Sequence, residues 1–579
     1  SGSIRAVLQH SMKASIHLRT LIWIPILAFM ASAQNLDEAR QALDPERQKE
    51  IWDSEHVTFK IEKRFGKWFL DGLRKQDAGV LAAAFHKEFS GKVIPAETSF
   101  EKFIKSNVEE VRRTAGEKPA NAEDVAAALL DQLRLLDKIE ALNLRVLRIA
   151  TAGEGQWETR LLLTASGRSA EAKLVALESE HVVNFRTKSN SNFDAGAVIS
   201  SWKVLSETKR SAPQMLMEEV TEASQLHRLP LADNWKMPKE EISQRYSFQF
   251  AVEDFDRDGY LDIAIASVRG PTALLKSLGG QRFAVANKAF GLPMMATKAE
   301  RALACWLDFD NDGFPDLILG DRIYRNIKGK RFLEITTESG LKFSRAPMGC
   351  SIADYDGDGL CDLYVLYQGT TAGEEPLPWV GDDISGAPNV LWKNLGGGRF
   401  KNVSVESEAS AGKRNSFAAT WLYADDDALP DLYVANDFGT NNLLRNKGNG
   451  SFEEIAKQND VADFATSMGV ASGDLDNDGS PEIYVANMYS KMGRRIIAQV
   501  SEDDYGPGVH KQIKGACAGN RLYKRGPRGG PYTEKSESWG INDIGWAYAP
   551  AIADLNNDGL LDLHATTGFL SFDRSKPDG

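Results

Sequence analysis

The 579-residue sequence predicts a mainly β protein in which a smaller α+β domain precedes a long β domain. Three observations lead to this prediction. An acidic nine-residue motif occurs six times, short apolar β-rich segments flank each copy, and residues 36–210 have helical periodicity first and strand periodicity second. The chain has the composition of a folded protein, because 42% of its residues are hydrophobic and 26% are charged.

The charge and the cysteine content exclude several classes of protein. The 69 Lys and Arg residues and 81 Asp and Glu residues give a net charge of -12, so we do not expect a nucleic acid as partner. Four cysteines are too few for a disulfide scaffold and lack the paired spacing of a zinc site. They either pair after export or remain buried thiols. They are Cys305, Cys350, Cys361 and Cys517.

Residues 1–33 predict a signal peptide with some residues upstream of it. A basic stretch at 12–19 precedes an apolar run at 21–30, which leads into Ala31-Ser32-Ala33. The alternative is a membrane anchor, but a spanning helix needs about 20 apolar residues. Cleavage after Ala33 removes three basic residues and no acid, which lowers the net charge to -15. We expect a secreted, periplasmic or cell-surface protein without a transmembrane segment in the mature chain.

Residues 36–210 predict an α+β domain. Between Ala39 and Glu140, apolar residues recur at three- and four-residue steps, which predicts three to five amphipathic helices. The second helical run includes Phe100 to Val111, and the third extends from Val125 to Ile139. From Leu142 to Leu205 the period changes, and β-rich runs follow one another.

This order of elements, with the closing strand VISSWKVLSE at 198–207, resembles nuclear transport factor 2-like domains, in which helices cover a curved sheet. The resemblance implies a cone-shaped fold that can hold a pocket, and some related domains are enzymes that use an Asp and a His. The histidines of this segment are His56, His86 and His181. None is spaced with an acid as an acid-base pair, so we expect them to be structural or exposed and assign no catalytic residue.

Residues 214–579 contain the acidic loops. The first two copies read DFDRDGYLD and DFDNDGFPD, with acids at positions 1, 3, 5 and 9 and a glycine at position 6. The intact copies begin at Asp254, Asp308, Asp354, Asp474 and Asp554. The sixth copy, YADDDALPD, has Tyr423 in place of the first acid and Ala428 in place of the glycine, so we expect little or no ion binding there.

The spacing of the acids predicts a calcium site in each intact loop. Acids at positions 1, 3 and 5 converge when the loop turns at position 6, and the acid at position 9 closes the shell. Ca²⁺ binds six to eight such oxygens, whereas acids without a cation would repel one another. An EF-hand begins similarly but has Glu at position 12 and a helix on each side. We therefore predict about five structural Ca²⁺ ions. The predicted ligands are Asp254, Asp256, Asp258, Asp262, Asp308, Asp310, Asp312, Asp316, Asp354, Asp356, Asp358, Asp362, Asp474, Asp476, Asp478, Glu482, Asp554, Asn556, Asp558 and Asp562.

The segments around the loops predict a β-propeller. A short apolar strand precedes each loop, a strand such as DLYVAND follows it, and a glycine-rich turn leads into further strands, which makes four per unit. The units repeat every 46 to 54 residues where no insertion intervenes, which is near the length of a propeller blade. We predict six four-stranded blades, with seven as the alternative. Met215–Leu226 is expected to be the last strand of a blade that both termini complete.

The loop, the DLYVAN strand and the N-x-G-x-G-x-F turn resemble the FG-GAP or VCBS repeats of integrin α-subunit propellers, and more closely the cartilage acidic protein family. The resemblance covers residues 214–579. It implies structural Ca²⁺ at the blade edges and a propeller face that mediates adhesion or interaction.

The expected function is that of an exported, non-catalytic calcium-binding propeller that interacts with an extracellular or periplasmic protein or glycan. Two alternatives remain open: a carbohydrate-active enzyme similar to propeller-type polysaccharide lyases, and a lectin. A lyase would need a base beside an open metal position, and no His or Lys recurs near the loops except His564, which argues against this alternative.

Overall fold

The structure is a computed structural model. It describes residues 44–95, 98–105, 107–114, 117–187, 198–229, 248–267, 271–294, 303–369, 386–489, 491–505, 507–516, 518–526 and 529–568. The predicted signal peptide and Cys517 lie outside these ranges. Cys305, Cys350 and Cys361 are free thiols. Within the described ranges, none of the helices combines the length and apolar character needed to span a membrane.

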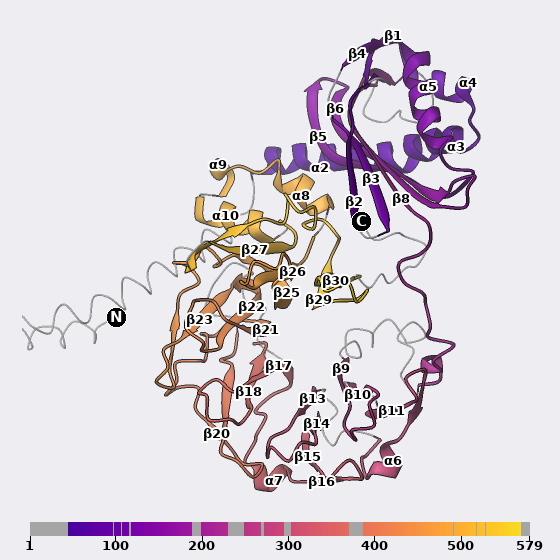
Figure 1. Cartoon of the computed structure of the whole chain (residues 1–579). Coiled ribbons are helices and arrows are strands. Elements are labelled where there is room, and N and C mark those ends of the chain that lie inside the picture. The colour runs from indigo at the N-terminus through magenta and orange to yellow at the C-terminus, as the bar shows by residue number, and fades with distance from the viewer. Residues whose placement is uncertain are drawn as a thin grey trace, which may run out of the picture. The chain divides into compact units, whose positions relative to one another are not determined.

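The chain forms two compact units (Figure 1). The N-terminal unit consists of Leu43–Val220 and Lys491–Val500. The C-terminal unit includes Thr221–Ser490 and Ser501–Asp578.

The N-terminal unit begins with helices. They are α2 (Pro45–Lys60), the π-helical turn η1 (Ile61–Phe65), α3 (Gly66–Arg74), α4 (Ala78–Ala82) and, after four strands, α5 (Ala122–Leu133). Helix α5 starts at a capping box, in which Asn121 Oδ1 accepts the backbone N–H of Asp124 and Asp124 Oδ2 accepts that of Asn121. These reciprocal bonds explain why a helix begins here directly after a strand.

One antiparallel-rich sheet packs against these helices. Its strands are β1 (Phe85–Val93), β2 (Glu101–Lys105), β3 (Val108–Arg113), β4 (Lys118–Ala120), β5 (Lys138–Gly153), β6 (Gln156–Arg168), β7 (Leu174–Arg186) and β8 (Ile199–Ala212). The order is β2-β3-β8-β7-β6-β5, with β1 parallel to β8 and β4 paired to β1. Phe65 and Phe69 of the helices bury their rings against Phe185 and Trp202 of the sheet. The helix-plus-sheet character of this unit is as predicted.

The helical run predicted at Phe100 to Val111 is wrong. This segment is the hairpin of β2 and β3, and β3 pairs with β8. The side chains of Phe103 and Ile104 are 49% and 70% exposed, so their helical spacing does not mark a buried helix face. Pairing with a long neighbouring strand has overridden a weak local pattern.

Helix α8 (Lys491–Ile497) belongs to the N-terminal unit, although it follows the second strand of the fifth C-terminal sheet. Arg495 explains this placement. Its Nε and Nη2 donate to the Glu55 carboxylate at 2.7 and 2.6 Å, and its Nη1 donates to the Val146 carbonyl at 2.8 Å. The Arg495 side chain is only 7% exposed, so this is a buried bidentate ion pair.

The C-terminal unit is built of consecutive antiparallel sheets. The four-stranded sheets are β9 (Phe248–Glu253), β10 (Asp262–Ser267), β11 (Ala273–Leu278), β12 (Arg282–Val285); β13 (Leu303–Leu307), β14 (Asp316–Gly320), β15 (Arg322–Asn326), β16 (Phe332–Glu334); β17 (Pro347–Ala353), β18 (Asp362–Tyr367), β19 (Val390–Asn394), β20 (Phe400–Asn402); β21 (Ser416–Leu422), β22 (Asp431–Thr440), β23 (Asn442–Asn446), β24 (Phe452–Glu454); and β25 (Phe464–Gly473), β26 (Glu482–Asn487), β27 (Arg521–Gly526), β28 (Gly530–Glu534). The fourth and fifth of these sheets are joined into one continuous eight-stranded sheet, because β22 also pairs with β25. A pair, β29 (Ala547–Ala553) and β30 (Asp562–Thr567), follows them. The short helices are η2 (Leu226–Arg228), α6 (Asn287–Phe290), α7 (Thr336–Ser339), α9 (Glu502–Tyr505) and α10 (Pro507–Ala516).

The core of this unit lies between successive sheets. The first strand of each sheet contacts the first strand of the next, and a separate apolar cluster fills each interval. Between the first two sheets, Phe255 stacks on Trp306 with ring centroids 5.8 Å apart, and Phe332 packs beside both. The predicted fold class is confirmed: the chain is mainly β, with several four-stranded antiparallel sheets after a helix-plus-sheet unit.

The strand expected at Met215–Leu226 is not present. The Ser224 carbonyl accepts a hydrogen bond from Phe283 on β12, and Leu226 packs with Leu275 of the first sheet. The end of the segment, from Thr221 onward, therefore lies against the first sheet instead of extending β29 and β30. Among the described residues of the C-terminal unit, three sheets have four strands, the fourth and fifth sets of four strands are joined into one eight-stranded sheet, and one sheet has two strands. Closure into a propeller stays a prediction.

His181 is a buried residue of the N-terminal core. The indole Nε1 of Trp202 donates to its Nδ1 at 3.0 Å, and its Nε2 lies 2.8 Å from Ser179 Oγ. Because an indole N–H only donates, Nδ1 must be unprotonated, and the neutral ring donates its Nε2 proton to Ser179. Burial lowers the pKa of His181 to about 3. The hydrogen bond therefore runs in the wrong direction for His181 to act as a base toward Ser179.

Replacing His181 with Gln should make the N-terminal unit less sensitive to acid. The unfolded histidine titrates near 6.5 and the folded one near 3, so the unfolded state binds more protons between these values, and stability present above pH 6.5 is lost as the pH falls. At pH 4 this loss is about 3 kcal/mol, which Gln, able to keep both hydrogen bonds, does not suffer. Hydrogen exchange of β7 amides, corrected for intrinsic rates, measures the difference between pH 7 and pH 4. Equal losses in both proteins would show that His181 does not titrate as described.

Candidate metal centres

Each intact acidic loop joins the first and second strands of a sheet and is folded by its own first carboxylate. In the second loop, Asp308 Oδ1 accepts the backbone N–H of Asp312 at 3.2 Å, and Oδ2 accepts that of Gly313 at 2.9 Å. The other four intact loops repeat both bonds. Gly313 has φ +87°, a left-handed conformation that explains the glycine at position 6.

The acid at position 9 is the first residue of the second strand and is buried in four of the intact loops. Asp316 has no exposed surface; its Oδ2 accepts the N–H of Phe309 at 3.1 Å, and its Oδ1 accepts that of Asn326 at 2.6 Å. Burial raises the pKa of Asp262 to about 6, that of Asp316 to about 8 and that of Asp362 to about 7. Because these carboxyl groups are shielded from water, their ionised forms need a nearby positive charge.

Positions 1, 3 and 9 converge in four loops, where one ligand oxygen from each lies within 4.8 Å of the others. The triads are Asp254, Asp256 and Asp262; Asp308, Asp310 and Asp316; Asp354, Asp356 and Asp362; and Asp474, Asp476 and Glu482. The predicted position-5 ligands, Asp258, Asp312, Asp358 and Asp478, are not members of these triads. Their Oδ1 atoms accept the backbone N–H two residues later, at 2.9 to 3.0 Å.

The oxygens of two triads fit a cation. Asp310 Oδ1 and Asp356 Oδ1 are buried and have no hydrogen-bond partner. A buried carboxylate oxygen without a donor is costly unless a cation compensates it. Because every converging group is a carboxylate, the donor set is that of a hard cation such as Ca²⁺.

The loop from Asp554 to Asp562 was predicted as a fifth site, but it does not form a carboxylate triad. Its position 3 is Asn556, whose Oδ1 accepts the N–H of Asp558 at 2.9 Å. Its three predicted acids, Asp554, Asp558 and Asp562, are not among the groups of acids that converge. The described residues group acids in four loops instead of five.

The degenerate loop from Tyr423 to Asp431 contains a guanidinium contact. Arg525, on β27 of the following sheet, donates from Nη2 to Asp426 Oδ1 at 2.5 Å and from Nη1 to the Asp425 carbonyl at 3.4 Å. The Arg525 side chain is 5% exposed, whereas Tyr423 is 54% exposed. A side chain from the next sheet thus supplies positive charge to this loop.

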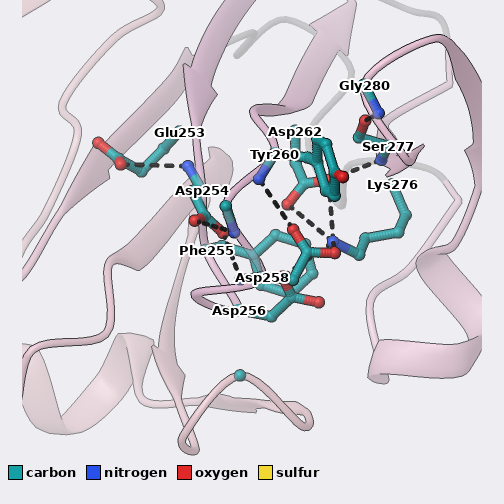
Figure 2. Close-up of polar contacts among 12 residues, drawn as sticks. Glu253, Asp254, Phe255, Asp256, Asp258, Tyr260, Asp262, Lys276, Ser277 and Gly280 are labelled. Carbon is teal, nitrogen blue, oxygen red and sulfur yellow. Dashed lines mark hydrogen bonds and ion pairs between the residues drawn. The ribbon is translucent and has the colours of Figure 1, made fainter.

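Sequence reasoning missed the basic residues that contact the acidic loops. Figure 2 shows Lys276 of β11 with its amine directed at Asp256, Asp258 and Asp262 of the first loop. A signal was available, because every third strand of the four-stranded sheets has a basic residue at the equivalent position, just before the glycine-rich turn. These residues are Lys276, Arg325, Lys393, Arg445 and Lys524.

The residue after this basic position connects one sheet to the loop of the sheet before it. The amide Nδ2 of Asn326 donates to the Phe255 carbonyl at 2.8 Å, and its backbone N–H bonds to Asp316 in its own loop. Asn394 and Asn446 repeat the pattern toward Phe309 and Tyr355 at 3.0 and 2.6 Å. Neighbouring loops are therefore hydrogen-bonded through one side chain.

Comparison with known proteins supports the repeat assignment. A family model described as an FG-GAP-like repeat matches residues 254–319, 308–365 and 424–485. Cartilage acidic protein 1 of Xenopus tropicalis is 23% identical over 382 residues, which cover 56% of this chain and 57% of that protein. The Mus musculus protein is 23% identical over 383 residues with the same coverage, and the Homo sapiens protein is 24% identical over 269 residues, 42% of this chain and 39% of that protein.

The matched region spans just over half the length of the first two relatives. A solved structure of BBS1N in complex with ARL6DN aligns with 58% of this chain and 88% of that chain at 10% identity, with a TM-score of 0.24. The chain thus contains FG-GAP-like repeats and is distantly similar to cartilage acidic protein 1.

Replacing Asp310 with Ala should destabilise the C-terminal unit in calcium more than replacing Asp425 with Ala. Asp310 belongs to a triad, whereas Asp425 occupies the same position in the degenerate loop. At calcium 100-fold above the dissociation constant, one lost ion costs about 2.7 kcal/mol, whereas a surface change costs about 0.5 kcal/mol or less. Thermal unfolding in calcium and in chelator measures both variants. Equal melting in calcium would mean that the two loops are equivalent.

Proposed function

We propose that this protein is an exported, non-catalytic binding module whose C-terminal unit is stabilised by calcium ions at four acidic loops. The observation that carries the proposal is the convergence of three acids in each of four loops. The two buried, unpartnered carboxylate oxygens of Asp310 and Asp356 support it independently. A bound Ca²⁺ supplies the positive charge that offsets repulsion among these acids.

The position of the acids supports a structural role for the ions. In each triad, the position-1 acid follows the first strand and the position-9 acid begins the second strand, so an ion would tie two paired strands together at one end. The position-9 acid also holds the loop backbone, as Asp316 holds Phe309. An ion at this place would be part of the scaffold, as the FG-GAP-like repeat assignment also suggests.

The chemistry of the lysines supports a binding role over an enzymatic one. A lyase needs a neutral base near the ion. Burial alone would lower the pKa of Lys276, but its hydrogen bonds to Asp256 and Asp258 raise the pKa above its usual range. Lys393 and Lys524 have raised pKa values for the same reasons. In loops without an ion, these amines hold their protons firmly and are poor general bases.

We assign the partner to the extracellular or periplasmic proteins and glycans, because residues 1–33 have the pattern of a signal peptide and the chain carries a net charge of -12. The N-terminal unit, with helices covering a sheet, is proposed to be nuclear transport factor 2-like and to contribute to the same binding role. A closed propeller of six or seven blades is the proposed arrangement of the C-terminal sheets.

Purified protein dialysed against calcium-free buffer and then calcium should retain about four ions per chain, because four loops have carboxylate triads. Excess chelator should lower the melting temperature of the C-terminal unit, since a ligand that binds only the native state stabilises it. Elemental analysis and calorimetry measure both effects, with magnesium at equal ionic strength as the control. One ion or none per chain would refute the calcium proposal.

Glycan-array screening should find binding that depends on calcium, because loss of the ions loosens the strand ends that hold the surface loops in place. The Asp310→Ala protein should bind more weakly than the Asp425→Ala protein on the same array. Release of unsaturated oligosaccharides from a bound glycan would instead identify a lyase and contradict the non-catalytic proposal. Binding that is equal in calcium and in chelator would contradict the role assigned to the ions.

A further inference from the structure

The amine of Lys276 lies among the acids of the first loop. Its Nζ is 2.8 Å from Asp256 Oδ1, 2.7 Å from Asp258 Oδ2 and 3.4 Å from Asp262 Oδ1 (Figure 2). Two of these three acids belong to the first triad. The Lys276 side chain is 15% exposed, so water screens these contacts less than those of a surface pair.

Two other loops have the same arrangement. Lys393 of β19 pairs with Asp356 and lies 3.0 Å from Asp358 in the third loop. Lys524 of β27 pairs with Asp476 and lies 2.7 Å from Asp478 and 3.4 Å from Glu482 in the fifth sheet's loop. In all three loops, the ammonium contacts the position-3 carboxylate, which is a member of the triad.

The second loop differs because its basic residue is an arginine. Arg325 Nε is 3.1 Å from Asp310 Oδ2, while its Nη2 donates to the Gly397 carbonyl at 2.7 Å in the next sheet. The guanidinium is thus shared between Asp310 and a carbonyl outside the loop. The second oxygen of Asp310, Oδ1, is buried without a partner, and no ion pair between Arg325 and Asp316 occurs among the described residues.

An ammonium and a calcium ion compete for these carboxylates. Ca²⁺ binds carboxylate oxygens at about 2.3 to 2.6 Å, and a lysine nitrogen hydrogen-bonded to the same carboxylate groups would lie only a few Å from the ion. Repulsion between two positive charges at such a distance is strong away from bulk water. The lysine must therefore leave its acids when the ion binds.

We propose that Lys276, Lys393 and Lys524 are tethered competitors of calcium, which neutralise three of the acidic loops without an ion and set a lower calcium affinity there than in the Asp308–Asp316 loop. This inference rests on the proposed calcium function. It also gives the loops two charge-balanced states, one with the ammonium inside and one with the ion inside. The three loops fill at a higher calcium concentration than the loop beside Arg325.

The test compares wild-type protein with the triple variant Lys276→Met, Lys393→Met and Lys524→Met. Bound calcium is measured by equilibrium dialysis at a series of buffered free-calcium concentrations. Each removed ammonium competes for the carboxylates through charge-assisted hydrogen bonds. Without it, the three sites should bind calcium at about tenfold lower free calcium. The ion of the Asp308–Asp316 loop should not shift.

The matched control is Lys447→Met. Lys447 pairs with Glu408 at 2.9 Å in an exposed turn, and neither residue belongs to a triad. This variant should bind calcium as wild type does. Unchanged or weaker binding in the triple variant, with wild-type protein still binding about four ions, would overturn the competition. Failure of wild-type protein to bind calcium would overturn the proposed function first.

Thermal unfolding in chelator is a second test of whether the lysines neutralise the loops. The triple variant leaves three acidic loops without a counter-charge, so its melting temperature should fall below that of wild type in chelator and recover in calcium. Circular dichroism in calcium establishes that the variant is folded. The single variant Lys276→Met repeats the comparison with one loop if the triple variant does not fold. Equal melting of wild type and either folded variant in chelator would show that the lysines do not neutralise the loops.

Discussion

Converging carboxylates need positive charge, and this constraint shapes the C-terminal unit. Each four-stranded sheet begins its second strand on an acid with no exposed surface, and in four of the sheets two further acids lie within a few Å of it. Such a group is stable only with a cation or with donors directed at it. Backbone N–H groups offset part of the negative charge, and lysine, arginine or a metal ion offsets the remainder.

The buried acid also determines the local backbone. Asp362 accepts N–H groups from Tyr355 in its own loop and from Asn394 on the third strand, so one side chain joins three segments of a sheet. These bonds do not require an ion. The loop can therefore keep these hydrogen bonds when the neutralising charge is exchanged, although the tie that an ion makes between the two strand ends is then lost. This separation of backbone support from charge balance lets the same nine-residue frame hold acids with either an ammonium or a metal ion.

The features that could be predicted from the sequence depend on residues that are close together in the chain. Acids at fixed spacing around a glycine, and apolar β-rich segments beside them, are local patterns, and they gave the strands, the loops and the members of each triad. Lys276 lies 14 residues beyond the last acid of its loop, and Lys524 lies 42 residues beyond. Their contacts depend on how the strands of a sheet pair, which no local spacing encodes.

The hairpin containing Phe103 was missed for the related reason that its partner strand β8 is about a hundred residues away. The position-5 acids remain predicted ligands, and the structure adds that each of the four beside a triad also accepts a local N–H.

The asparagines after the basic position make each sheet depend on the next one along the chain. Asn326, Asn394 and Asn446 each reach back to the loop of the preceding sheet. Arg525 occupies the same place in the fifth sheet, and it reaches back to the loop that has lost its first acid and its glycine. The fourth repeat thus lacks the acid and the glycine, and the guanidinium that contacts its loop comes from the fifth repeat. Consequently the repeats are not interchangeable modules: moving the fourth sheet without the fifth would remove this contact, and the smallest exchangeable unit in this fold is a pair of neighbouring sheets.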